Sequence, residues 1–274
     1  MAKNKPQPSN TKAAQARAKA QAQVKAEERR TGIIIAAVSA VVILVFGGIV
    51  WFIVESGKVP SLDSDDLAKP AASDVYGGIP VDATGSVSAD VPADQPRVDI
   101  YLDFMCPICN QFEQVNAEDL DALREEGEVQ LYYHPISILD RYSSGTEYST
   151  RAANAVATVA DQAPDAFLDF SAALFANQPT EGGEGLSDEQ IEQIAIAAGV
   201  PEDVAAQFES QDFRAWVKAA TDQSSQNYVQ GTPTVRVVGP GEEFSDVDDQ
   251  DAILQQSEVP YFEPGQLRAY IEGL

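Results

Sequence analysis

A stretch of 23 uncharged, mostly apolar residues runs from Gly32 to Val54. At about 1.5 Å per residue, a helix of this length crosses a hydrocarbon core of roughly 30 Å. Trp51 and Phe52 lie near one end, where aromatic side chains are typical of a lipid–water interface. A cleavable signal peptide has a shorter apolar core, and no small-x-small cleavage site follows the stretch before Glu55. The sequence therefore predicts a retained transmembrane anchor that contacts the lipid bilayer over 32–54.

Charge is distributed unequally on the two sides of this anchor. Residues 1–54 carry eight Lys or Arg and two Glu, a net charge of +6, which leaves −31 of the total −25 for residues 55–274. Basic residues next to an anchor mark its cytoplasmic side, and only Lys58 follows closely. We therefore expect a cytoplasmic N-terminus and an extracytoplasmic C-terminal region. Such an acidic region argues against nucleic acid as a partner, because phosphate contacts require Lys or Arg.

Composition divides the rest of the chain into three parts. Residues 1–31 have no apolar periodicity and predict a basic cytoplasmic tail, disordered or weakly helical. Residues 55–73, with repeated Ser, Asp and Pro, predict a flexible linker. The globular region is expected over 74–274, and the acidic run 242–251 within it predicts a solvated loop.

The globular region starts with signals for a βαβ unit. Turn residues over 76–87 predict a short edge hairpin. The apolar run 97–104 predicts a strand buried on both faces, and Pro107 fits the first turn of a helix that follows it. A second apolar run over 128–139 predicts another strand, which should lie parallel to the first.

A long segment from about 141 to 228 is almost purely helical in its pattern. Its repeated Phe, Ala and Ile are typical of core packing, and Ser187–Gln190 is a capping box that opens a helix ending at Gly199. Strand character returns at 234–238, and Pro264 opens a final short helix. The chain is therefore expected to be an α/β protein with an inserted helical subdomain.

The chain has two cysteines, Cys106 and Cys109, and they follow the first buried strand directly. A cysteine at a helix N-terminus meets unpaired N–H groups and the positive end of the helix dipole, which favour the thiolate. A disulfide between residues three apart closes almost no loop, so it is a poor structural crosslink. Zinc requires about four ligands, whereas the chain offers two cysteines and one histidine, so no metal site is expected.

Two motifs and the helical segment between them resemble one family. The chain has Phe104-Met105-Cys106-Pro107-Ile108-Cys109 at a strand-to-helix junction and Gly231-Thr232-Pro233-Thr234 before the next strand. Together they are similar to the membrane-anchored bacterial DsbA-like thiol oxidoreductases of the thioredoxin superfamily, over about 200 residues from Asp74. The resemblance implies a thioredoxin-like fold with a helical insertion, and no cofactor beyond the redox-active disulfide.

The resemblance also implies roles for the second motif. Pro233 is expected to be cis and to face the two sulfurs, and the backbone of Thr232 is expected to pair with a bound substrate strand. An ordinary trans proline at the start of an edge strand is the alternative.

Position assigns the two sulfurs different roles. Cys106 is expected to be the nucleophile, and Cys109, one turn inside the helix, the more buried resolving thiol. Pro107, Ile108 and Met105 are expected to support the site, although Ile108 replaces the His of the best-known family members.

Nearby ionisable residues are expected to matter less. The buried carboxylate that many family members place six residues before the first cysteine falls on Ile100. Asp103 is a candidate supporting residue near the dithiol, but a solvent-facing turn carboxylate is the favoured interpretation. His134 is expected to be structural rather than part of the active site.

These observations predict an extracytoplasmic thiol–disulfide oxidoreductase, foremost an oxidase that forms disulfides in exported cysteine-containing proteins. The resemblance implies reoxidation by a membrane partner of the quinone-linked kind. A reductase or isomerase using the same residues remains an alternative, because the motif does not fix the reduction potential. A redox-inactive thioredoxin-like interaction module is the alternative from a different class.

Overall fold

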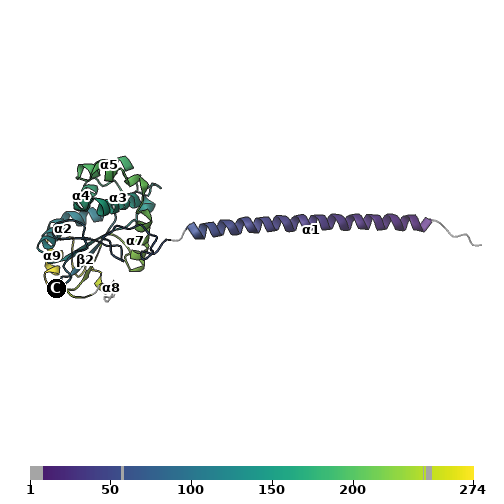
Figure 1. Ribbon diagram of the computed structural model, residues 1–274. Coiled ribbons are helices and arrows are strands. Elements are labelled where there is room, and N and C mark those ends of the chain that lie inside the picture. Colours follow the sequence, from purple (N-terminus) through teal and green to yellow (C-terminus); the bar gives the residue numbers. More distant parts are fainter. Residues whose placement is uncertain (1–8, 57–58, 243, 245–248) are drawn as a thin grey trace, which may run out of the picture. The chain divides into compact units, whose positions relative to one another are not determined.

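The chain separates into two compact units after residue 58 (Figure 1). The computed structural model describes residues 9–56, 59–242, 244 and 249–274. In its described part, the first unit is helix α1 (Ser9–Ser56), and over Ala13–Phe52 this helix is long and apolar enough to cross a membrane by length and composition.

The structure describes the basic tail and the acidic loop only in part. Of the two states predicted for the basic tail, disordered or weakly helical, its described part is helical from Ser9 onward, because Ala, Gln, Lys, Glu and Arg are strong helix formers. Residues 1–8 of that tail, and residues 243 and 245–248 of the acidic loop, lie outside the described residues.

The second unit is built around a sheet that, in the described chain, has four strands in the order β1-β3-β2-β4. The strands are β1 (Ile79–Val81), β2 (Arg97–Leu102), β3 (Gln130–Pro135) and β4 (Thr234–Val238). Strands β2 and β3 are parallel, which confirms the βαβ prediction, and β4 is antiparallel to β2. Five of the six residues in each central strand are buried, which explains their near-continuous apolar sequence.

Strand β1 confirms the predicted hairpin over 76–87 only in part. It has three residues, and all three pair antiparallel with β3. Val81 and Val87 form only an isolated bridge. The turn signals were local, whereas the pairing partner lies about fifty residues further along the chain.

Helix α2 (Pro107–Glu125) follows β2 and connects it to β3. Its buried side chains include Cys109, Phe112, Leu120 and Leu123, which recur at helical spacing. The short C-terminal helix α9 (Gln266–Ile271) packs against α2 and begins two residues after Pro264. A further short helix, α8 (Asp249–Ala252), packs against β4.

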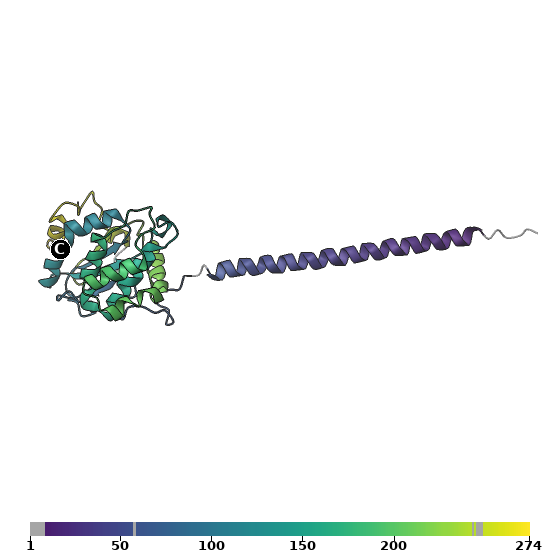
Figure 2. The same ribbon diagram turned by 90° about the horizontal axis from the view of Figure 1, so that it is seen from above.

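The predicted helical insertion is present between β3 and β4. Figures 1 and 2 show its helices, coloured teal to green, gathered over one side of the sheet. They are α3 (Tyr148–Gln162), α4 (Phe167–Ala176), α5 (Asp188–Ala197), α6 (Glu202–Ala205) and α7 (Arg214–Gln226), with 3-10 turns η1 (Asp140–Tyr142), η2 (Pro164–Ala166) and η3 (Phe208–Ser210). The predicted capping box of α5 is confirmed, because Ser187 and Gln190 exchange both hydrogen bonds.

The segment predicted as a flexible linker over 55–73 packs on the second unit in its described C-terminal part. Leu62 is 2% exposed and Leu67 8%, and both belong to the main hydrophobic core. The backbone N–H of Ala71 also donates a hydrogen bond to Asp161 of α3. Burial of these two leucines therefore attaches the segment to the core, although its composition is typical of a flexible linker.

Candidate active site

The two cysteines lie where β2 passes into α2. Cys106 is the N-cap residue of α2, with extended backbone angles (φ −78°, ψ 114°), and Pro107 is the first helical residue. The N–H of Cys106 donates to the carbonyl oxygen of Asp103 at 2.9 Å, which closes the turn. Both cysteines are free thiols; Cys106 is 6% exposed and Cys109 is fully buried. A partner from solvent therefore reaches the sulfur of Cys106 first.

The environment separates the two thiols electrostatically. A hydrogen bond from Cys109 is the main factor that lowers the pKa of Cys106 to about 6; the Thr232 side chain and the N–H groups of Cys109 and Ile108 add to it, against the effect of burial. Burial is the main factor that raises the pKa of Cys109 well above its usual value, and the nearby charge of Cys106 adds to it. The thiolate of the reduced pair therefore resides on Cys106.

The second motif lies beside the dithiol, although 126 residues separate it from Cys106 in the sequence. The peptide bond between Thr232 and Pro233 is cis. The thiol of Cys106 donates a hydrogen bond to the carbonyl oxygen of Thr232, with an Sγ–O distance of 3.2 Å. Strand β4 begins at the next residue, Thr234, whose hydroxyl bonds to the carbonyl of Gly231. The structure thus brings together the four residues predicted for catalysis and substrate binding.

The predicted supporting residues have different environments. Met105 is fully buried, whereas Ile108, two residues after Cys106, is 48% exposed. Pro107 starts the helix that supplies the N–H groups. The side chain of Ile108 therefore offers an apolar surface near Cys106 but no charge and no hydrogen-bonding group.

Asp103 is fully buried, so the favoured interpretation of it as a solvent-facing turn carboxylate is wrong. Its carboxylate accepts hydrogen bonds from the N–H of Met105 at 2.9 Å, the N–H of Leu139 at 2.9 Å and the hydroxyl of Ser149 at 2.6 Å. Burial nevertheless raises the pKa of Asp103 to about 7. The turn after β2 is covered by the loop before η1 and by α3, which local sequence does not reveal.

His134 lies in β3 and is 1% exposed. Its Nε2 is 2.7 Å from the carboxylate of Asp99, and its ring stacks on Tyr101 at 4.1 Å. Arg97 binds the same carboxylate at 2.6 Å, so Asp99 is held by two partners within the sheet. These contacts account for His134 as part of a buried structural network. In the described chain, no group of three or more His, Cys, Asp or Glu side chains is arranged to hold a metal ion.

Sequence reasoning missed Gln178, which follows α4. Its side-chain N–H groups donate to the carbonyl oxygen of Phe104 at 3.0 Å and to that of Cys106 at 2.9 Å. In the opposite direction, Asn110 of α2 donates to the carbonyl of Phe175 in α4 at 3.0 Å. A single Gln between a helix and a proline carries no sequence signal for this contact.

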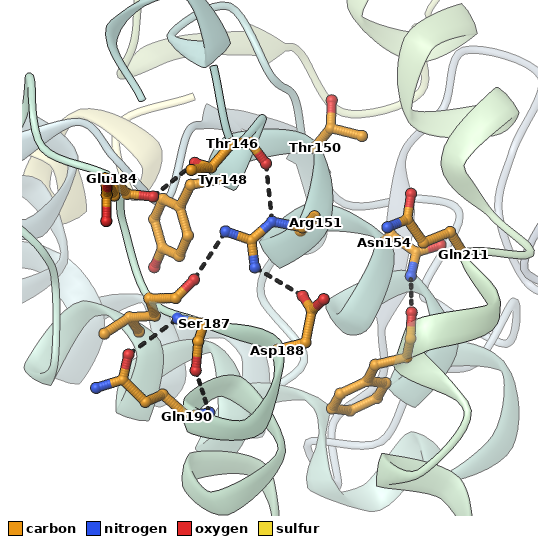
Figure 3. Close-up of polar contacts among 12 residues, drawn as sticks. Thr146, Tyr148, Thr150, Arg151, Asn154, Glu184, Ser187, Asp188, Gln190 and Gln211 are labelled. Carbon is orange, nitrogen blue, oxygen red and sulfur yellow. Dashed lines mark hydrogen bonds and ion pairs between the residues drawn. The ribbon is translucent and has the colours of Figure 1, made fainter. Parts of the chain in front are cut away.

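The first turn of α3 is hydrogen-bonded to the residue stretches that precede and follow helices α3 and α4, at 146 and 186–188 (Figure 3). Arg151 donates to the carbonyls of Thr146 at 2.9 Å and Leu186 at 2.8 Å and to the carboxylate of Asp188 at 2.6 Å. Ser149, two residues earlier, bonds to Asp103. One helix end therefore supports both the turn that precedes the dithiol and the loop that connects α4 to α5.

Comparison with known proteins gives a consistent result. The family model described as Thioredoxin matches residues 91–255. The crystal structure of oxidised Mycobacterium tuberculosis (Mtb) DsbA is similar with a TM-score of 0.51 at 30% identity, covering 61% of this chain and 85% of that one. Reduced DsbG from Mycobacterium tuberculosis, a disulfide bond oxidoreductase, is similar with a TM-score of 0.51 at 31% identity, covering 61% of this chain and 80% of that one.

Two further similarities are more limited. MdbA of Actinomyces oris shares the fold, with a TM-score of 0.56 at 22% identity over 79% of this chain and 97% of that one. The serine/threonine-protein kinase PknE of Mycobacterium tuberculosis is 32% identical over 106 residues, which are 37% of this chain. The match spans only 19% of the length of that kinase, so it concerns one part of the larger protein.

Proposed function

Because the chain belongs to the thioredoxin family, we propose that it is a membrane-tethered thiol–disulfide oxidoreductase that forms disulfides in exported proteins. The asymmetry of the dithiol carries the proposal. Cys106 lies at a helix N-terminus with its pKa lowered to about 6, and Cys109 lies fully buried behind it. Similarity to Mycobacterium tuberculosis proteins named DsbA and disulfide bond oxidoreductase supports the same chemistry.

The reaction starts from the Cys106–Cys109 disulfide, and this disulfide is the only redox group required. A substrate thiolate attacks Sγ of Cys106, a new S–S bond forms, and the electron pair of the broken bond passes to Cys109. Cys109 then takes up a proton, because its pKa is raised well above the usual value. A second substrate thiolate attacks the substrate sulfur of the mixed disulfide and releases Cys106 as a stable thiolate. Two electrons have passed from the substrate to the enzyme.

Substrate binding is assigned to the surface around Cys106. The backbone of Thr232 lies within hydrogen-bond distance of the nucleophile and suits pairing with an extended peptide segment. The exposed side chain of Ile108, two residues after Cys106, offers apolar contact. Extended segments of exported proteins that have not yet folded meet both requirements.

Turnover requires a partner that accepts two electrons from the reduced pair. A quinone-linked membrane protein is the chemical class we assign to it, and the apolar helix α1 would keep the enzyme in the same bilayer. The basic residues before the apolar stretch favour a cytoplasmic N-terminus, which leaves the dithiol on the extracytoplasmic side.

The reduction potential tests the direction of the reaction. The full-length protein in detergent is equilibrated with glutathione buffers, and the fraction of Cys106–Cys109 disulfide is measured after acid quenching and thiol labelling. An oxidase has a potential well above that of thioredoxin, because a low thiolate pKa stabilises the reduced form. A value near about −270 mV contradicts the oxidase assignment and favours a reductase.

A pair of activity assays tests the chemistry itself. Oxidation of a dithiol peptide and reduction of insulin are measured with the unmodified protein and with Cys106→Ser. We expect exchange with the first protein and none with the variant. Absence of exchange in both directions with the unmodified protein would leave the interaction-module alternative.

A further inference from the structure

The main chain around the nucleophile is bound from outside by one side chain of the helical insertion. The amide of Gln178 bridges the carbonyl oxygens of Phe104 and Cys106, at 3.0 and 2.9 Å. These two carbonyls flank Met105 and belong to the turn from which the thiol projects. Within the described part of the chain, the hydrogen bonds of the Gln178 side chain go to main-chain carbonyls and not to either sulfur, so its influence on the reaction acts through the backbone.

The position of Gln178 is itself fixed by the insertion. Its N–H donates to the carbonyl of Phe175 at 3.2 Å, and the ring of Phe175 packs on that of Phe104 with centroids 4.9 Å apart. Asn110 of α2 donates to the same Phe175 carbonyl. The end of α4 and the dithiol turn are therefore connected by hydrogen bonds in both directions and by a ring contact.

These bonds affect the thiolate for two reasons. The thiolate is stabilised by the N–H groups of Ile108 and Cys109, and these act on the sulfur only while the main chain of Cys106 keeps its N-cap geometry. In addition, the amide places the positive end of its dipole against the carbonyl of the nucleophile itself. The carbonyl oxygen of Cys106 also accepts hydrogen bonds from the N–H groups of Cys109 at 3.1 Å and Asn110 at 3.4 Å, both within α2.

We propose that Gln178 is a positioning residue of the active site, which holds the Cys106 main chain so that its thiolate faces the first N–H groups of α2. The helical insertion thereby contributes to the reactivity of a nucleophile that lies outside it. This inference rests on the proposed function, but its test measures only the reactivity of the Cys106 thiol.

The test is the pH dependence of Cys106 alkylation in the reduced, full-length protein in detergent. Iodoacetamide rates are measured from the mass of the peptide that contains Cys106. Gln178→Ala removes the hydrogen-bond donor. Gln178→Glu keeps the length of the side chain, but its carboxylate cannot donate to the two carbonyl oxygens. Asn177→Ala is the matched control, because the neighbouring Asn177 donates only to Ala173 of its own helix.

We expect a midpoint near pH 6 for the unmodified protein. Gln178→Ala should raise it by about half a pH unit, which slows alkylation at pH 5 by about threefold through the smaller thiolate fraction. Gln178→Glu should raise it by about one pH unit and slow the same reaction by about tenfold. Asn177→Ala should leave the midpoint unchanged.

Unchanged midpoints in both Gln178 variants, or an equal rise in Asn177→Ala, would overturn the proposal. Thermal melting of each variant is measured in parallel, so that a general loss of structure is distinguished from a local effect on the thiol. A variant that melts as the unmodified protein does but alkylates more slowly at pH 5 supports positioning. Because alkylation needs no redox partner, it decides this inference even if the exchange assays fail.

Discussion

Cys106 and Cys109 are separated by one helical turn, yet their thiols have opposite pKa shifts. The N-cap residue has its sulfur outside the helix, where N–H groups and the Thr232 side chain stabilise a charge. Cys109 lies one turn further on, where its side chain is buried in the core and a charge on its sulfur would not be solvated. The proposed roles of Cys106 as nucleophile and Cys109 as leaving group are therefore consistent with their positions along one helix.

Replacement of Cys109 by Ala tests the coupling between the two thiols. The hydrogen bond from Cys109 contributes most to lowering the pKa of Cys106, so its loss should raise that pKa by about one pH unit. Cys109→Ser is the control, because its hydroxyl still donates, and it should show a smaller rise. The ultraviolet absorbance of the thiolate is measured against pH. Equal midpoints in the reduced parent and the Ala variant would contradict the assigned cause.

Asp103 should make the stability of the protein depend on pH. Burial raises its pKa to about 7, so the native state binds this proton more tightly than the unfolded state does. The contribution is fully present below about pH 4, the unfolded pKa, and is lost as the pH rises through 7. Between pH 4 and pH 7, the free energy of unfolding of the parent should therefore fall by about 2–4 kcal/mol more than that of Asp103→Asn.

Urea unfolding followed by the fluorescence of the buried Trp216 measures this difference. Glu113, whose pKa is also raised to about 7, contributes equally in both proteins and cancels from the comparison. Parallel pH profiles for the two proteins would show that Asp103 does not titrate in this range.

At the scale of elements, local patterns predicted β2, α2 and β3 because each carries its own signal. The strands are continuous apolar runs, and α2 begins with Pro107 and keeps helical spacing. The contacts that cover the turn between β2 and α2 come from distant segments. Asp103 is bonded by Leu139 and Ser149, 36 and 46 residues away, and no periodicity within the turn indicates this.

The loop between α4 and α5 offers a second test at this scale. A Cβ at Gly185 would lie 2.4 Å from the side chain of Tyr148, and the residue has a φ of +76°. Gly185→Ala should therefore destabilise the protein by about 3 kcal/mol or more, through overpacking and backbone strain together. Gly182→Ala, at φ +88° with no atom within 4 Å, isolates the strain and should cost about 1 kcal/mol. Similar melting temperatures for the two variants would show that Tyr148 moves aside.

At the scale of the whole molecule, the sequence combines a basic end, an uncharged helix and an acidic region. Residues up to 54 carry +6 and those that follow carry −31. In the apolar part of α1, the backbone N–H and C=O groups can pair with one another within the helix, as a membrane span requires. The acidic unit beyond it is repelled by anionic lipid, which favours a thiol site that is open to soluble substrates.

The orientation of the anchor is tested by synthesis of the chain in the presence of sealed, inverted bacterial membrane vesicles. Because basic residues are retained on the cytoplasmic side, added protease should remove only the N-terminal tail and leave the unit from Val59 onward protected until detergent opens the vesicles. A variant with Arg29→Glu and Arg30→Glu, together with Ser56→Lys and Ser61→Lys, weakens the bias of basic residues toward the N-terminal side and should lose uniform protection. Digestion of the second unit in intact vesicles of the unmodified chain would place the dithiol in the cytoplasm. There the glutathione pool favours the reduced pair, and a disulfide-forming role would have to be abandoned.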